Sequence, residues 1–246
     1  MRIALKITTA VMFMAASAGA FSVRAQVADN LATFDSNPPE VVSAPSRPAP
    51  AGGSYRLSKG DNEFGFWGGG AFTATTIFGG LTDAEASDRH FVVAAFRYGR
   101  TLAANDSLAL QYTLDAIPLA VATGNIESST TVTTGGTTVT TFTRDTAYGV
   151  GVTPLGLQLD FANQSRVKPF IHLNGGLLVF NESVPLPDAG KLGLVGEAGA
   201  GLRIFTSERR AVSLGVRFHH ISNGDRAGAN RGLNQFIFYA GFSVFK

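Results

Sequence analysis

The sequence predicts an all-β fold, an eight-stranded antiparallel transmembrane β-barrel formed by residues 61–246. Three observations predict it. Eight segments alternate apolar and polar residues with a period of two, the pattern of strands whose two faces meet different surroundings. They run about 10 to 15 residues, whereas soluble strands usually have about five or six and tilted membrane strands need about 9–11. The connections alternate between short and long, as they do in outer-membrane barrels.

A positively charged and then apolar segment opens the chain. Arg2 and Lys6 precede an apolar or small-residue run over 7–20, and residues 23–25 fit a small-x-small cleavage site. The run is shorter than the about 20 residues of a spanning helix, so we expect 1–25 to be a cleaved signal peptide. Removing its three cations from the 20 basic residues leaves 17 against 18 acidic ones. This balance argues against a nucleic-acid partner.

Residues 26–60 hold five prolines among Ala, Ser and Gly, which predicts an extended periplasmic leader with little capacity to form a core. The chain has no Cys, which excludes disulfides, a thiol nucleophile, Cys-ligated zinc and a lipoprotein anchor. Neither a phosphate-binding loop nor a nucleotide fingerprint nor paired metal ligands occur in the sequence. We therefore expect no cofactor and no metal.

Each predicted strand follows from this alternation. In the third, apolar residues from Leu108 to Ala116 share one face, opposite Gln111, Thr113 and Asp115. The fourth, sixth and seventh segments show the same division. The polar face, including Asp115, predicts a polar network inside the barrel together with Glu197, Arg203 and Arg217. The predicted strands are 62–73, 89–99, 106–117, 147–161, 167–180, 191–205, 209–222 and 233–245.

Closure of the sheet follows from the membrane, because lipid cannot satisfy an open strand edge. A soluble, lipocalin-like barrel with its apolar face inward is the alternative, but the export segment, the strand lengths and the unequal loops favour the membrane barrel. Residues 128–146 contain ten threonines. We interpret them as a polar hairpin that extends the third and fourth strands, with a turn at Gly135-Gly136. A flap that contacts substrate is the alternative.

Candidate chemistry lies at the last hairpin. His220 and Ser222 are two residues apart, so on a strand they share a face, and that face is otherwise apolar back to Val212. Asn234 belongs to the apolar face of the next strand, so we expect it beside the pair. Polar groups at the margin of a lipid-facing stripe are costly unless they are paired or used. His219 faces the opposite way, toward the interior.

These residue types are those of a serine esterase. Ser222 would be the nucleophile, His220 its general base, and Asn234 the group that orients the imidazole. Asp225, in the loop, is an alternative acidic partner. Asn223, Gly224 and Asn230 are candidates for the oxyanion site, through side-chain or backbone donors.

The run from His220 to Asn223, followed by Asn230-x-Gly, resembles the lipid A 3-O-deacylase family of the PagL type. The resemblance implies an eight-stranded outer-membrane barrel, with Ser222 as nucleophile, His220 as base and Asn230 near the oxyanion. The family's third triad member is a Glu, and its position falls on Asn234 in this sequence. The same run also resembles outer-membrane phospholipase A, whose third member is an Asn but whose barrel has twelve strands.

The resemblance implies a serine esterase that removes the 3-O-linked hydroxyacyl chain from lipid A of lipopolysaccharide. With the leader in the periplasm, odd-numbered strands run outward, which places Ser222 near the outer leaflet of a Gram-negative outer membrane. The partners we expect are lipid A and the membrane, with a second copy of the chain as a further candidate. A phospholipase A-like esterase and a non-catalytic structural barrel are the alternative functions.

Overall fold

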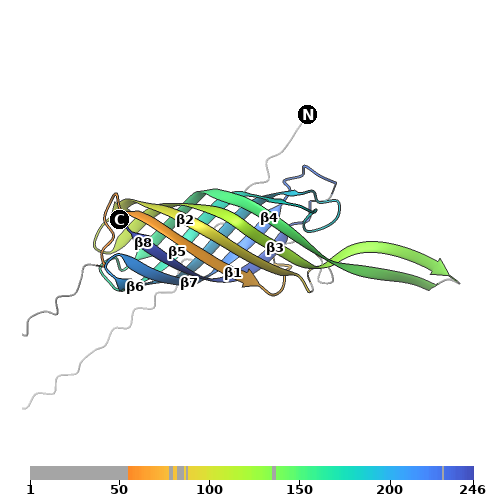
Figure 1. The fold of residues 1–246 in the computed structure, drawn as a ribbon, viewed down its shortest axis with the longest axis horizontal. Helices are drawn as coiled ribbons and strands as arrows, with labels where there is room; N and C mark the ends of the chain where they lie inside the picture. The colour runs from red at the N-terminus through yellow and green to blue at the C-terminus, as the bar shows by residue number, and fades with distance from the viewer. Residues whose placement is uncertain (1–54, 78–79, 82–85, 87, 135–136, 229) are drawn as a thin grey trace, which may run out of the picture. The chain divides into compact units, whose positions relative to one another are not determined.

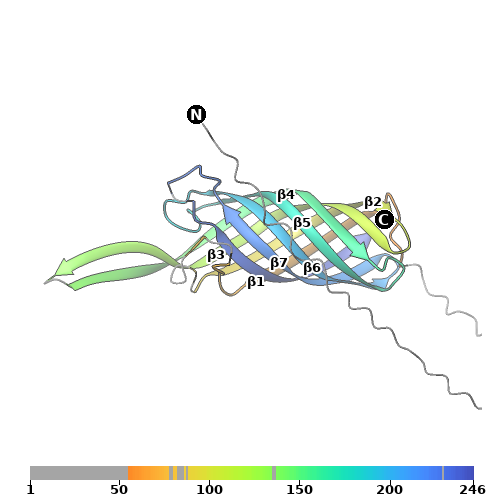
Figure 2. The ribbon, with the colours of Figure 1, turned by 180° about the vertical axis from the view of Figure 1, so that it is seen from behind.

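The computed structural model describes residues 55–77, 80–81, 86, 88–134, 137–228 and 230–246. The predicted signal peptide, most of the predicted leader and the predicted Gly135-Gly136 turn lie outside these residues. Each strand pairs antiparallel with the next, and β1 pairs with β8, so the sheet is a closed eight-stranded barrel, as the sequence predicts (Figures 1 and 2). The strands are β1 (Asn62–Ala71), β2 (His90–Ala104), β3 (Leu108–Thr134), β4 (Thr137–Phe161), β5 (Val167–Phe180), β6 (Leu192–Ser207), β7 (Arg210–Ser222) and β8 (Leu233–Phe245).

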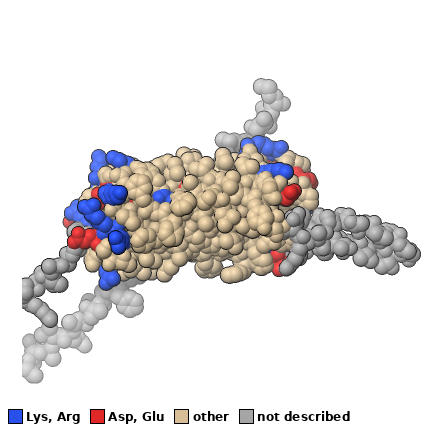
Figure 3. Space-filling view, viewed as in Figure 1, with Lys and Arg blue, Asp and Glu red and all other residues tan. Residues whose placement is uncertain are grey.

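The barrel is apolar outside and polar inside. On β1, Phe64 and Phe66 point outward and are 50% and 58% exposed, whereas Glu63 points inward and is 1% exposed. On β7, Leu214 is 50% exposed and Arg217 is fully buried. On the face seen in Figure 3, charged side chains gather toward the two ends and the middle is almost free of them. A barrel in water would bury its apolar face, so this arrangement is that of a membrane barrel and excludes the lipocalin-like alternative. No helix in the described residues is long and apolar enough to cross a membrane.

Buried ion pairs fill the lumen and confirm the predicted interior network. Their side chains are nearly inaccessible, and each cation has an acidic partner within hydrogen-bonding distance. Pairing is required because an uncompensated charge in this interior would cost several kcal/mol, about 3–5 when one partner is removed. The pairs are Arg97–Asp115 at 2.7 Å, Arg203–Glu63 at 2.8 Å, Arg203–Asp160 at 3.0 Å and Arg217–Glu197 at 2.8 Å.

At the end of the barrel with the short turns, the lumen is covered by residues that the sequence assigns to the leader. Leu57 is 1% exposed and belongs to a cluster that includes Phe205 and Phe245. Its backbone N–H donates to Asn163 Oδ1 at 3.0 Å, and Asn163 Nδ2 donates back to its carbonyl at 2.9 Å. Residues 55–60 are therefore part of the barrel's packing. One apolar residue among Ser, Lys and Gly has no periodicity, so the sequence pattern does not reveal this contact.

The two ends of the barrel differ, as the sequence predicts. The connections 105–107, 162–166 and 208–209 are short, whereas 72–89, 181–191 and 223–232 are long. At the end with the long loops, β3 and β4 continue beyond their neighbours as a paired ribbon (Figure 1). Their backbones stay paired, with interruptions of the register, as far as Thr134 and Thr137, so the threonine-rich segment extends these two strands.

Candidate active site

The candidate residues lie at the loop end of the β7–β8 hairpin, where the barrel carries its long loops. Because side chains alternate along a strand, His220 and Ser222 share the outward row of β7 that contains Phe218 and Leu214, while His219 points into the lumen. His219 is fully buried, and its Nδ1 lies 2.8 Å from Glu197 Oε1. The two adjacent histidines thus have different surroundings. His219 belongs to the lumen network, and His220 faces the exterior of the barrel.

His220 and Asn234 are direct register partners across β7 and β8. Their side chains meet, with His220 Nδ1 2.6 Å from Asn234 Oδ1. An amide oxygen can only accept, so Nδ1 carries the proton in this contact and Nε2 is left as the basic nitrogen. The predicted pairing of these two residues is present in the structure. It gives the imidazole the tautomer that a general base for a hydroxyl requires.

Ser222 is the last residue of β7 and is half-buried. It lies one step beyond His220 on the same row, and its register partner on β6 is Leu194. Alternate residues of a strand are about 6.6 Å apart along the chain, a distance that an imidazole side chain can span. The described contacts contain no hydrogen bond between the two side chains. The structure therefore places His220 and Ser222 next to each other on the outward face of β7.

Gly232 is a neighbour of the imidazole that the sequence analysis missed. A Cβ atom at this position would lie 2.5 Å from His220 Cε1 and 3.1 Å from its Nδ1. Only glycine therefore lets the backbone before β8 pack against the ring. The resemblance includes this glycine within Asn230-x-Gly, but the spacing alone gives no indication that it contacts His220.

The oxyanion candidates are held in the loop between the two strands. Asn223 points inward and is buried, and its Nδ2 donates to the Ala189 carbonyl at 2.8 Å. Asn230 is exposed and donates from Nδ2 to Asp225 Oδ1 at 2.7 Å. Asp225 is thus bonded within the loop, and the described partner of His220 is Asn234. Gly224 has a φ of +62° and turns the chain away from β7. The backbone N–H groups of Asn223 and Gly224 come directly after Ser222 in the chain.

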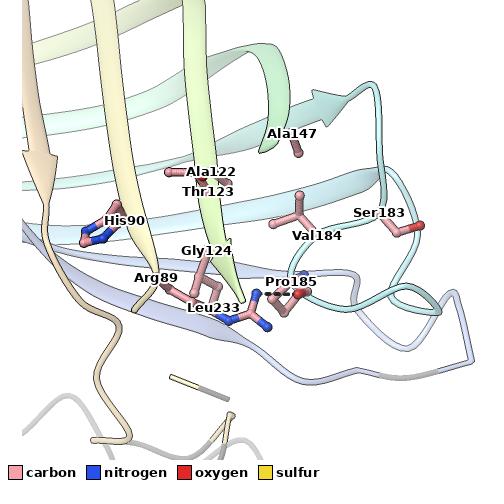
Figure 4. Close-up of a pocket in the computed structure, with 10 residues that line it drawn as sticks. All are labelled: Arg89, His90, Ala122, Thr123, Gly124, Ala147, Ser183, Val184, Pro185 and Leu233. Atoms are coloured by element: carbon pink, nitrogen blue, oxygen red, sulfur yellow. Dashed lines mark hydrogen bonds between the residues drawn. The ribbon is translucent and has the colours of Figure 1, made fainter. Parts of the chain in front are cut away.

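A small pocket in the lumen, at the end with the long loops, is separate from these residues (Figure 4). Leu233 lines it, and Arg89 Nη1 donates beside it to the Pro185 carbonyl at 2.5 Å. Its volume is about 10 Å³, which is room for about one water and not for an acyl chain. Leu233 faces inward whereas Asn234 is on the outward row of β8, so the pocket and the candidate site lie on opposite faces of the barrel wall.

The outer wall itself carries a shallow apolar hollow across β6, β7 and β8. It lies on the outward rows that lead from His220 and Ser222 toward the middle of the barrel. Its lining mixes small, branched and aromatic side chains, so an apolar chain could lie against it. The outward-facing residues that line it are Ala200, Leu202, Leu214, Val216 and Phe238. Among the described residues, no three His, Asp or Glu side chains are grouped to hold a metal ion.

Comparison with known proteins places the chain in a family. The family model described as lipid A 3-O-deacylase (PagL) matches residues 106–243. No curated protein matches the chain. Similar solved structures include the outer membrane enzyme PagL, with 15% identity, a TM-score of 0.42 and coverage of 74% of this chain and 98% of that one.

Two further solved structures are similar at the same level. Neisserial surface protein A (NspA) has 13% identity and a TM-score of 0.41, with 76% of this chain and 97% of that one covered. The outer membrane protein OprG from Pseudomonas aeruginosa has 13% identity and a TM-score of 0.41, with 78% and 99% covered. The family model spans more than half of the chain, from the start of β3 almost to the end of β8, and the protein belongs to the lipid A 3-O-deacylase (PagL) family.

Proposed function

We propose that the protein is an outer-membrane serine esterase that removes the 3-O-linked hydroxyacyl chain from lipid A. The observation that carries this proposal is the 2.6 Å contact between His220 Nδ1 and Asn234 Oδ1, on the lipid-facing row that also holds Ser222. A histidine oriented in this way, beside a serine, is the arrangement that activates a hydroxyl nucleophile. The family match supplies the substrate class.

The proposed reaction has two steps. Ser222 Oγ attacks the ester carbonyl while His220 Nε2 takes the hydroxyl proton, and the tetrahedral intermediate collapses to an acyl-enzyme. The imidazolium returns the proton to the departing sugar oxygen. Water then attacks the acyl-enzyme with His220 again as base, which releases the fatty acid and restores Ser222. The backbone N–H groups after Ser222 and the amide of Asn230 are the proposed donors to the oxyanion.

The position of the site supports a lipid substrate. His220 and Ser222 lie near the end of the barrel that carries the long loops, and the apolar hollow lies further along the same outward row of β7, at Val216 and Leu214. With this end at the cell exterior, the ester of an outer-leaflet lipid would lie level with Ser222 and its acyl chain along β6–β8. Such a substrate reaches the site by lateral diffusion and need not enter the lumen.

A phospholipase A-like activity is the second candidate. The observation that favours it is Asn234, because the outer-membrane phospholipase A that the sequence resembles also has an Asn as its third triad member. Purified protein in detergent micelles, supplied separately with lipopolysaccharide and with glycerophospholipid, distinguishes the two. Release of 3-hydroxy fatty acid from lipopolysaccharide supports the proposal. Lysophospholipid as the sole product supports the second candidate. No product from either substrate, with the barrel folded, leaves a structural role.

A matched pair of serine variants links either product to the site. Ser222 and Ser213 both lie on β7, with Ser222 on the outward row and Ser213 on the inward row. Ser222→Ala should abolish product formation, whereas Ser213→Ala should retain it. Equal activity of the two variants would contradict the assignment of Ser222 as nucleophile.

A further inference from the structure

We propose that residues 72–77 and 80–81 of the β1–β2 loop position the third member of the triad. The backbone carbonyl of Ile77 fixes the orientation of the Asn234 amide and, through it, the tautomer of His220. The catalytic consequence rests on the proposed esterase function. The choice of the His220 nitrogen that carries the proton does not depend on that function.

After β1 ends at Ala71, the chain crosses the start of β8. Ala74 forms an antiparallel bridge with Gln235, and the Thr75 N–H donates to the Asn234 carbonyl at 2.7 Å. The Ile77 N–H in turn donates to Thr75 Oγ1 at 3.2 Å. These contacts make the segment continuous with the edge of β8, even though it is not part of the β1–β8 ladder.

The loop covers Asn234. Phe236 and Phe238, which share its outward row on β8, are 41% and 66% exposed, whereas Asn234 is 1% exposed. Its Nδ2 donates to the Ile77 carbonyl at 3.2 Å, on the side away from His220. The amide is thus held between a backbone carbonyl and an imidazole.

The chemistry of these groups sets one orientation. A backbone carbonyl only accepts, so the amide nitrogen of Asn234 must face Ile77 and the amide oxygen must face His220. That oxygen also only accepts, so His220 Nδ1 must donate, and Nε2 is the nitrogen left to receive the Ser222 proton. The direction of each bond is therefore determined by the Ile77 carbonyl.

An Asn needs this second contact, whereas a carboxylate does not. Both oxygens of a carboxylate accept, so either can face the imidazole. An amide that turned over would offer its NH₂ group to Nδ1 and favour the opposite tautomer, in which Nε2 carries the proton and cannot act as base. The Ile77 carbonyl prevents that rotation, so the Asn234 amide keeps one orientation toward His220.

Gly80 is the residue that allows the loop to approach so closely. Its φ is +100°, and a Cβ there would lie 2.3 Å from the Gly232 carbonyl oxygen and 3.3 Å from Asn234 Nδ2. Gly232 is itself packed against the His220 ring. An alanine at position 80 must therefore move the loop away from the hairpin.

The first test compares Gly80→Ala with Gly60→Ala. Gly60 has a similar φ of +96°, but its Cβ direction is open to 4 Å and it lies beside the opposite end of β1. Both variants have the backbone strain of an alanine in the left-handed region, and only Gly80→Ala moves the loop. We expect kcat of Gly80→Ala to fall by about tenfold or more with KM within about twofold, because the base and not substrate binding is altered. Gly60→Ala should retain both constants, and equal kinetics in the two variants would overturn the proposal.

The second test uses Asn234→Asp, which keeps the size of the side chain and replaces its donor by an acceptor. With the Ile77 carbonyl in place, one carboxylate oxygen would face another acceptor, so we expect Asn234→Asp to be less active than the wild type. Adding Gly80→Ala, which releases the loop, should then raise the activity of Asn234→Asp. If Asn234→Asp exceeds the wild type and Gly80→Ala lowers activity equally in both backgrounds, the loop does not orient residue 234.

A spectroscopic measurement separates this proposal from the esterase assignment. The four histidines are labelled with ¹⁵N in the folded barrel in micelles, and His220→Gln identifies the signals of His220. We expect the Nδ1–H tautomer in the wild type and in Gly60→Ala, and a mixture in Gly80→Ala. This result would support the positioning role even if the wild type cleaved no ester. An unchanged tautomer in Gly80→Ala would overturn it even if Ser222 proved to be the nucleophile.

Discussion

His220 Nδ1 and Asn234 Oδ1 lie 2.6 Å apart, and the two residues are direct register partners on β7 and β8 although ten residues of loop separate the strands. The hairpin therefore creates the pair through backbone register. The contact lies on the outward face of the barrel, and the Ile77 carbonyl bonds the amide from its other side. Structural support for the imidazole thus comes from β7, β8 and the β1–β2 loop together.

Gly232→Ala should reduce catalysis without unfolding the barrel. The added Cβ would lie 2.5 Å from His220 Cε1, so the ring must move, and a displacement of about 1 Å can cost on the order of 100-fold in rate. Gly196→Ala is the matched control, because Gly196 is the register partner of His220 on β6 and its Cβ direction is open to 4 Å. Steady-state kinetics on lipopolysaccharide measures both variants. Similar losses in the two would mean that crowding of the ring by residue 232 is not what matters.

Glu197→Gln should destabilise the barrel. Glu197 accepts from Arg217 and Asn174, each at 2.8 Å, and contacts His219, so removing its charge leaves a buried guanidinium without its counter-charge. We expect a loss of about 3–5 kcal/mol in the free energy of unfolding. Urea unfolding in lipid vesicles, followed through the single tryptophan, Trp67, measures the change. Glu208→Gln, in an exposed turn, is the control and should leave the free energy of unfolding unchanged. If Glu197→Gln also left it unchanged, the buried ion pair would not stabilise the barrel.

Leu214→Arg tests the assignment of the outer face to lipid. Leu214 is 50% exposed near the middle of β7, where a cation in the hydrocarbon layer should cost about 2–4 kcal/mol. The same urea titration in vesicles gives the free energy of unfolding. Ser207→Arg, at the exposed end of β6, is the control and should change it by less than about 1 kcal/mol. An equally small effect of Leu214→Arg would place that face in water.

Much of the fold could be predicted from the sequence because a membrane barrel imposes a strict period of two. Each residue of β7 from Val212 to Ser222 takes the face that the alternation predicts, and the inward placement of His219 and the outward placement of His220 follow from it. The His220–Asn234 pairing was also predictable, since parity places both residues on the outward face of adjacent strands.

The remaining features depend on contacts that have no period. Leu57 covers one end of the lumen from an irregular segment, and Ile77 contributes a backbone carbonyl, which leaves no side-chain pattern to recognise. The role of Gly80 depends on its approach to Gly232, which is 152 residues further along the chain. Asn223 was predicted as an oxyanion donor through its side chain or backbone, but its side chain bonds Ala189 because the 181–191 loop folds against the hairpin.

The mass of lipid A in cells that express the protein tests the central claim most directly. Lipid A is compared by mass spectrometry from cells producing the wild type, Ser222→Ala or Ser213→Ala, each confirmed as a folded barrel in the outer membrane. The account predicts that the wild type and Ser213→Ala remove one hydroxyacyl chain and that Ser222→Ala removes none. The same loss of mass with Ser222→Ala, or unchanged lipid A with the wild type, would contradict it.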